Sequence, residues 1–291
     1  MKRIDFRDQI SSNKRKSFFL MISVFVILIA LGYFISLAFS PEYLFFIIII
    51  AIIFSMSYIL ISYYNSHKIA IASVKATKAY KDDYKQYHDL VEGLTLASGL
   101  PKPELYIMHS KSINAFASGR DPSHAVICVT EGALEKLDKN ELEGVLAHEL
   151  GHIASFDMRY MTLVAVMVGM IAIISQIFLR SLWFSSGGND KNKAIFILIG
   201  IVLAILAPIV VYLVQMSISR KREFSADASA VKFTRYPNGL IRALKKIQKD
   251  SNFSEKKISK AIAPLFISSP FGKLSSTHPP IEKRISALEK M

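Results

Sequence analysis

Residues 145–153 of the chain read VLAHELGHI. The two histidines, His148 and His152, are four positions apart and therefore lie on one face of a helix, one turn from each other. That spacing lets both imidazoles reach one metal ion, and Glu149 can then act as a general base at the metal's open position. The apolar neighbours predict a buried helix, which we expect to run from Glu141 to about Phe156.

The pattern H-E-x-x-H is typical of zinc peptidases. Catalytic zinc takes three protein ligands and keeps a fourth position for water. One solution places a third histidine six residues after the second, but Ser155 and Met158 stand where that solution needs glycine and histidine. The sequence therefore predicts one zinc ion per chain, with its third ligand supplied by a carboxylate from a separate helix.

Hydrophobic residues make up 52% of the chain and are concentrated in four long uncharged runs. The first run is about 33 Å long as a helix, which is enough to cross a bilayer. It is too long for a cleaved signal peptide, and a second run follows almost at once. We therefore expect a multi-pass α-helical membrane protein embedded in the lipid bilayer. The four predicted spans are 18–39, 43–64, 161–179 and 194–217.

The net charge of +13 comes from basic residues that flank the apolar runs. This distribution follows the positive-inside rule, by which basic residues flank membrane spans on the cytoplasmic side, and it favours contact with anionic lipid. No motif in the sequence supports nucleic-acid binding. Both termini and the H-E-x-x-H helix are therefore expected on the cytoplasmic side of the cell (inner) membrane. The single cysteine, Cys128, excludes an intramolecular disulfide and a Cys-rich zinc site.

The segments outside the runs predict a soluble part with helices and a few strands. Residues 67–97 read as a helix that stops at Gly99, because two prolines follow. Residues 104–109 and 125–130 read as strands, and residues 114–119 as a loop or short strand. The expected division is a basic tail (1–17), a transmembrane hairpin (18–64), a first peptidase part (65–159), a second hairpin (160–218) and a second peptidase part (219–291).

The best candidate for the third zinc ligand is Glu223, just after the fourth run. Glu223 and Asp227 are four apart and share a helical face. Glu223 could bind zinc while Asp227 accepts a hydrogen bond from a ligating histidine. The alternative is a helix on which Arg220 and Glu223 simply pair at the surface. The hairpin of the third and fourth runs favours the first interpretation, because it returns this helix beside the H-E-x-x-H helix.

Five ordered motifs resemble those of the HtpX-type membrane-embedded zinc metallopeptidases, which are gluzincins related to the CAAX prenyl endopeptidases. They are GLPKP (99–103), NAFASG (114–119), GVLAHELGH (144–152), REFSAD (222–227) and STHPP (276–280) with an Arg-Ile pair at 284–285. Phe224 stands where tyrosine is common in the family. The resemblance implies a cytoplasmic, mainly α, zincin-like metalloprotease domain that contains a small β-sheet.

The resemblance also assigns the metal ligands and the base. It implies that His148, His152 and Glu223 bind zinc. It implies in addition that Glu149 takes a proton from the metal-bound water and later delivers it to the leaving amine.

Three further residues receive roles from the resemblance. Asn114 and the neighbouring edge strand would hold the substrate backbone as an added strand. His278 would act in catalysis by stabilising the oxyanion, or would lie near zinc, and Arg284 would support that loop or bind the substrate. Taken alone, Asn114 fits a turn, His278 a loop and Arg284 a helix surface.

The implied activity is hydrolysis of peptide bonds in membrane proteins, their cytosolic segments or unfolded polypeptides, in stress-related quality control. One alternative is a CAAX-type prenyl-protein endopeptidase, which four spans in place of a larger membrane chamber argue against. Another is a non-proteolytic scaffold or chaperone that keeps zinc for stability. The presence of Glu149 argues against it, because a structural site needs no base.

Overall fold

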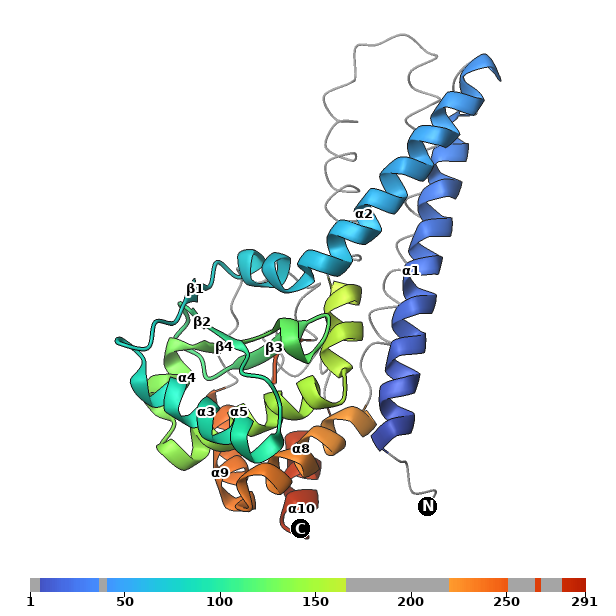
Figure 1. The fold of residues 1–291 in the computed structure, drawn as a ribbon. Coiled ribbons are helices and arrows are strands. Elements are labelled where there is room, and N and C mark those ends of the chain that lie inside the picture. The colour runs from blue at the N-terminus through green and yellow to red at the C-terminus, as the bar shows by residue number, and fades with distance from the viewer. Residues whose placement is uncertain (1–5, 37–40, 166–219, 251–264, 268–278) are drawn as a thin grey trace.

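Two long helices extend away from the rest of the protein in the computed structural model, which describes residues 6–36, 41–165, 220–250, 265–267 and 279–291 (Figure 1). These are α1 (Phe6–Ser36) and α2 (Leu44–Ser73), joined through a short 3-10 turn (Pro41–Tyr43). The other helices with described bounds are α3 (Lys85–Ser98), α4 (Glu131–Lys136), α5 (Lys139–Ala154), α8 (Arg220–Thr234), α9 (Pro237–Asp250), α10 (Ile281–Leu288) and the 3-10 turn Pro122–His124.

The helices α1 and α2 pack closely because small residues lie between them. A Cβ atom added at Gly32 would lie 2.4 Å from the Cβ of Ala51, and Ser55 and Ser62 of α2 are buried. Large apolar side chains instead face outward: Phe18, Phe19, Val26, Phe45, Phe46, Ile50, Ile53, Phe54 and Ile61 are all more than half exposed. Such a surface is costly in water and suited to lipid.

Within the described residues, α2 is the one helix long and apolar enough to cross a membrane, by length and composition. The first two predicted spans fall mainly on α1 and α2. α1 begins 12 residues before the first predicted span, and α2 continues nine residues past the end of the second. A further helix begins at residue 157 and is described to residue 165. The rest of the third predicted span and all of the fourth lie outside the described residues.

A small mixed sheet has the strand order β1-β2-β4-β3. Its strands are β1 (Thr77–Lys78), β2 (Glu104–Met108), β3 (Ala115–Gly119) and β4 (Ala125–Thr130). β2 runs parallel to β4, whereas β1 pairs antiparallel with β2 and β3 pairs antiparallel with β4. β3 is therefore an edge strand. Along its outer side, Phe116 bridges to Phe266, and the Ile267 amide donates a 2.9 Å hydrogen bond to the Ala115 carbonyl.

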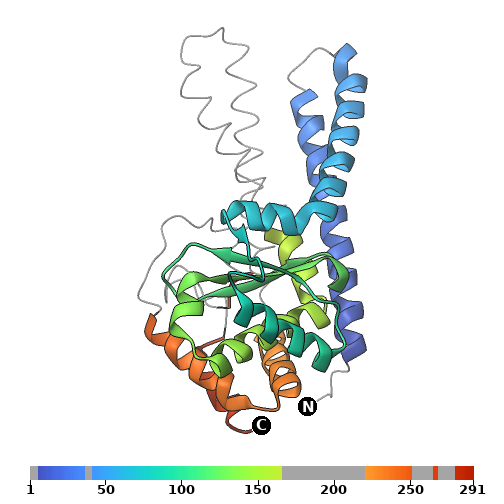
Figure 2. The ribbon, with the colours of Figure 1, turned by 60° about the vertical axis from the view of Figure 1, so that its left-hand side comes forward.

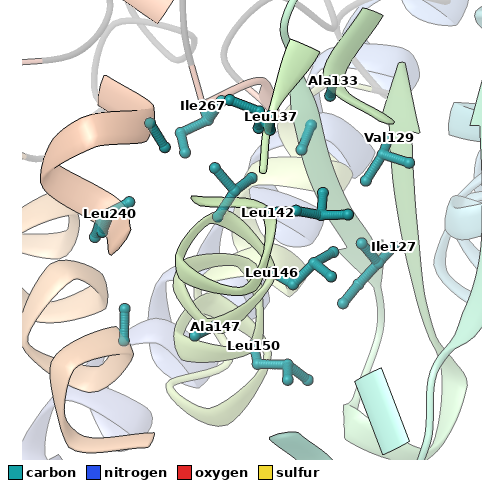
Figure 3. Packing of buried hydrophobic residues seen from close by; sticks show 14 of the residues in the cluster. Ile127, Val129, Ala133, Leu137, Leu142, Leu146, Ala147, Leu150, Leu240 and Ile267 are labelled. Carbon is teal, nitrogen blue, oxygen red and sulfur yellow. The ribbon is translucent and has the colours of Figure 1, made fainter. Parts of the chain in front are cut away.

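The helix α5 lies at the centre of the soluble part, between the sheet and the helices α8, α9 and α10 (Figures 1 and 2). Leu142 and Leu146 of α5 face Ile127 and Val129 of β4, while Leu240 of α9 packs from the other side (Figure 3). These residues are at most 2% exposed, and burying each large aliphatic side chain contributes about 1.5–3 kcal/mol. The apolar core thus fixes α5 on both faces.

Most of the expected elements are confirmed, with one exception. The predicted strands 104–109 and 125–130 are β2 and β4, and residues 115–119 form β3. The prediction of one helix over residues 67–97 was wrong. α2 ends at Ser73, Lys75 has a positive φ of 55°, and α3 begins only at Lys85. The helix is interrupted because Thr77 and Lys78, which lie between α2 and α3, form β1 and pair with β2. The predicted stop at Gly99 is confirmed by its φ of 72°.

Candidate active site

The helix α5 begins at a capping box that is also anchored to α9. The Asp138 carboxylate accepts a 2.9 Å hydrogen bond from the Glu141 amide, and the Glu141 carboxylate accepts one of 2.8 Å from the Asp138 amide. The Lys246 ammonium of α9 lies 2.6 Å from the buried Glu141 carboxylate. From Gly144 to Ile153 every residue is buried, which confirms the predicted buried helix.

Three buried side chains converge on one point between α5 and α8. The Nε2 atoms of His148 and His152 are 3.2 Å apart, and each lies 3.7 Å from a carboxylate oxygen of Glu223. Ligands about 2.0–2.1 Å from a tetrahedral zinc ion stand about 3.3 Å from one another. The spacings of 3.2 and 3.7 Å are close to that value, with a different oxygen of Glu223 facing each histidine, so the three side chains could hold a metal ion after a small movement.

A carboxylate behind His148 holds its ring. Nδ1 of His148 lies 2.9 Å from Oδ1 of Asp227, so the imidazole turns Nε2 toward the metal position. Asp227 is in turn held by Arg284 through two hydrogen bonds, of 2.9 Å from Nε and 2.6 Å from Nη2. Burial and the Arg284 charge lower the pKa of His148 to about 4. The ring is therefore neutral at neutral pH, as metal binding requires.

His152 has its own carboxylate neighbour, which sequence reasoning missed. Nδ1 of His152 lies 3.5 Å from Oδ2 of Asp157, a residue only 2% exposed. Burial lowers the pKa of His152, but Asp157, Glu223 and Glu149 together outweigh that effect and raise it to about 9 in the polypeptide alone. The sequence did contain a signal for this contact, namely an acidic residue that lies between the end of the H-E-x-x-H helix and the start of the third apolar run.

A glycine lets α8 approach α5 closely enough to deliver its carboxylates. A Cβ atom added at Gly151 would lie 3.1 Å from the Cα and the carbonyl oxygen of Ala226. Ala226 follows Glu223 by three positions on α8 and directly precedes Asp227. The backbone contact at Gly151 therefore sets the depth at which both acidic side chains reach the two histidines.

Glu149, the predicted general base, is buried next to the two histidines. Its side chain is 1% exposed, and neither carboxylate oxygen accepts a hydrogen bond of ordinary geometry from any described residue. Burial and the Glu223 carboxylate raise the pKa of Glu149 to about 7, against the opposing effects of His152 and of the Ala117 amide on β3. A carboxylate with such a pKa can both take and return a proton near neutral pH.

The three remaining predicted residues fall in different places. Asn114 is buried directly before β3, where its side-chain oxygen accepts a hydrogen bond from the Ala115 amide. Arg284 of α10 is fully buried, and its Nη1 lies 3.3 Å from Glu223 in addition to the contacts with Asp227. Its Nη2 also lies 3.3 Å from Nδ1 and 3.4 Å from Nε2 of His148. The guanidinium is therefore held by two protein carboxylates and lies directly against the first histidine. His278 lies outside the described residues.

A buried H-E-x-x-H helix with a glutamate from a second helix beside it is the arrangement of donor groups that metallopeptidases of the His-His-Glu class use. The model of peptidase family M48 matches residues 82–291, and the chain belongs to this family. It is thus a protease that uses a metal, and the sequence-based recognition is confirmed.

Named relatives extend the match to nearly the whole chain. The chain is 42% identical over 292 residues to a protease HtpX homolog of Caldanaerobacter subterraneus, covering 97% of this chain and 96% of the relative. It is 40% identical over 297 residues to a protease HtpX homolog of Dictyoglomus turgidum, covering 100% and 96%. These matches identify a membrane metalloprotease. The crystal structure of S. mikatae Ste24p aligns with 19% identity and a TM-score of 0.49, over 95% of this chain and 65% of that one.

Proposed function

We propose that His148, His152 and Glu223 bind one zinc ion and that the protein hydrolyses peptide bonds at this site. The observation that supports it most directly is the convergence of two Nε2 atoms and a carboxylate at spacings that suit a tetrahedral ion. When bound, zinc lowers the pKa of a coordinated water to about 7 and polarises the scissile carbonyl.

The polypeptide's own part in the reaction is proton transfer. We propose that Glu149 accepts the proton of the attacking water and returns it to the leaving amine. Its burial beside the two histidines, which raises its pKa to about 7 in the metal-free polypeptide, and the absence of a hydrogen bond of ordinary geometry from any described residue support this role. His278 is proposed to stabilise the oxyanion, a role that rests on the family motif.

The substrate is proposed to bind as an extended strand against β3. β3 is an edge strand, and it packs directly on α5, which bears the base. Residues 265–267 lie on the same outer side of β3 and pair with Ala115 and Phe116. A substrate strand that pairs with these residues must therefore replace the 265–267 segment. Asn114 is proposed to hold the entry end of this strand pair.

The exposed apolar surface of α1 and α2 supports a place in the membrane. We propose four spans, with both termini and the active site on the cytoplasmic side, and a peptidase domain divided between residues 65–159 and 219–291 by the second hairpin. A site at this position would act on membrane proteins, on their cytosolic segments or on unfolded polypeptides, as in quality control.

The test compares the purified protein with Glu149→Gln in detergent, using an unfolded membrane protein as substrate. Both should contain one zinc ion per chain, and only the wild type should cleave. Glu135→Gln, the same change at an exposed position of α4, should cleave normally. Equal cleavage by wild type and Glu149→Gln would refute the assignment of the base. Full zinc occupancy in Glu223→Ala would remove Glu223 from the ligand set.

A further inference from the structure

We propose that Asp157 and Asn13 position His152 for metal binding, so that helix α1 of the N-terminal hairpin helps to set the geometry of the metal site. The inference rests on the proposed ligation of zinc by His152. Its central observation is a chain of polar contacts that begins on α1 and ends at the outer nitrogen of this histidine.

Asp157 stands toward His152 as Asp227 stands toward His148. Each carboxylate faces the Nδ1 atom of its histidine, at 3.5 Å for Asp157 and 2.9 Å for Asp227. Nδ1 of His152 is buried and makes no hydrogen bond of ordinary length with the described part of the chain. Because a metal-bound histidine usually donates its other N–H to a carboxylate or carbonyl, Asp157 is the acceptor toward which this N–H points.

The orientation of Asp157 is fixed at both of its oxygens. Oδ2, the oxygen nearest His152, accepts a 2.7 Å hydrogen bond from the Ser155 hydroxyl. Oδ1 accepts a 2.6 Å hydrogen bond from Nδ2 of Asn13 and lies 3.3 Å from Nε of Arg222. With both oxygens held, the carboxylate cannot rotate away from the imidazole without breaking contacts in a buried setting.

Asn13 joins α1 to the end of the H-E-x-x-H helix. Its side chain is buried, and Nδ2 donates to the Ser155 carbonyl at 3.1 Å as well as to Asp157. Ser155 caps the C-terminus of α5. The side-chain amide of Asn13 therefore links α1 both to the end of α5 and to the Asp157 carboxylate. Asn13 lies 142 and 144 positions from these partners, and it stands just before the first apolar run.

This arrangement connects α1 to the proposed metal ligand His152 through a hydrogen bond from Asn13 to Asp157 and a 3.5 Å contact from Asp157 to His152. A shift of α1 relative to α5 would change the contact of Asn13 with Asp157, and through it the angle of the His152 ring. Asn13 and Asp157 are positioning residues, since neither touches the metal position.

The test measures metal binding in the full-length protein in detergent. Zinc dissociation constants come from competition with a chelator, and the visible absorption bands of the Co²⁺-substituted protein report ligand geometry. Asp157→Asn should weaken zinc binding about 10–100-fold, as removal of outer carboxylates does, and Asn13→Ala should weaken it by a smaller factor. Both should shift the Co²⁺ bands. Asn65→Ala, the matched change on α2, should leave both readouts unchanged, because among the described residues this side chain donates to the Ile61 carbonyl of its own helix.

A double-mutant cycle separates positioning from general packing. In the background of Asp157→Ala, Asn13→Ala should cause no further loss of zinc affinity, because Asn13 acts through Asp157. An equal loss in both backgrounds, or a zinc affinity and Co²⁺ spectrum of Asn13→Ala that match wild type, would overturn the inference. If Asp157→Ala does not fold, Asp157→Asn replaces it in the cycle. Failure of the wild type to bind zinc would instead refute the proposed function.

Discussion

Replacing Gly151 by alanine should weaken metal binding far more than it weakens the fold. The new methyl carbon would lie 3.1 Å from the Cα and carbonyl oxygen of Ala226 and from the Cβ of Ser229. Carbon atoms pack at about 3.5–4.0 Å, so α8 would have to retreat by about 0.5 Å. The contact is with backbone atoms, which cannot rotate out of the way.

A retreat of that size matters because metal sites tolerate only about 0.2 Å of error in ligand distances. Glu223 lies one helical turn before Ala226, so its carboxylate would move with the backbone. We therefore expect zinc affinity to fall about 10-fold or more. The free energy of unfolding should change by less than about 2 kcal/mol, since alanine is the better helix former by about 1 kcal/mol and offsets part of the strain.

The measurement is chelator competition for the zinc dissociation constant, with thermal unfolding of the metal-free protein in the same detergent. Gly93→Ala on α3 is the matched control, because a Cβ atom there meets nothing within 4 Å. It should leave zinc affinity unchanged and raise stability slightly. A zinc dissociation constant of Gly151→Ala within a factor of about two of the wild-type value would refute this reasoning. It would show that the close contact at Gly151 does not position the carboxylates of α8.

Three other predictions follow from buried groups. Arg284→Met should lower the free energy of unfolding by about 3–5 kcal/mol, since Asp227 loses its bidentate partner; denaturant titration checks this, and equal stability would contradict it. Gly144→Ala should cost about 1–3 kcal/mol, because its Cβ would lie 2.6 Å from the backbone nitrogen of Leu240; an unchanged melting temperature would count against it. Burial raises the pKa of Cys128, so a thiol reagent should label the native protein far more slowly than the unfolded one, and rapid native labelling would be inconsistent with the structure.

The sequence predicted the parts of the fold that local pattern controls. The H-E-x-x-H helix, β2 and β4 are read directly from apolar spacing and β-branched runs, and the stop of α3 follows from one glycine. The approach of Glu223 to the histidines was also predicted, because a hairpin of the third and fourth apolar runs would return its helix beside the H-E-x-x-H helix. The structure adds the distances that make this approach a metal site.

Spacing along the chain could not predict contacts between distant segments. The break after Ser73 depends on pairing of β1 with β2, which no pattern within residues 67–97 encodes. The contact of Asp157 with Asn13, a residue 144 positions away, could not be predicted for the same reason. For Arg284, the sequence alone favoured an exposed cation, because full burial of arginine is rare without the paired carboxylates that the fold supplies.

The order of these residues along the chain has a consequence for the time at which the enzyme becomes active during translation. His148 and His152 are made first, Glu223 follows after the second apolar pair, and Arg284 is made close to the end. At about 5–20 residues per second, on the order of ten seconds separates the synthesis of the histidines from that of Arg284. With the proposed ligand set, the two histidines are therefore made before Glu223, and the Asp227–Arg284 pair that holds His148 is completed last.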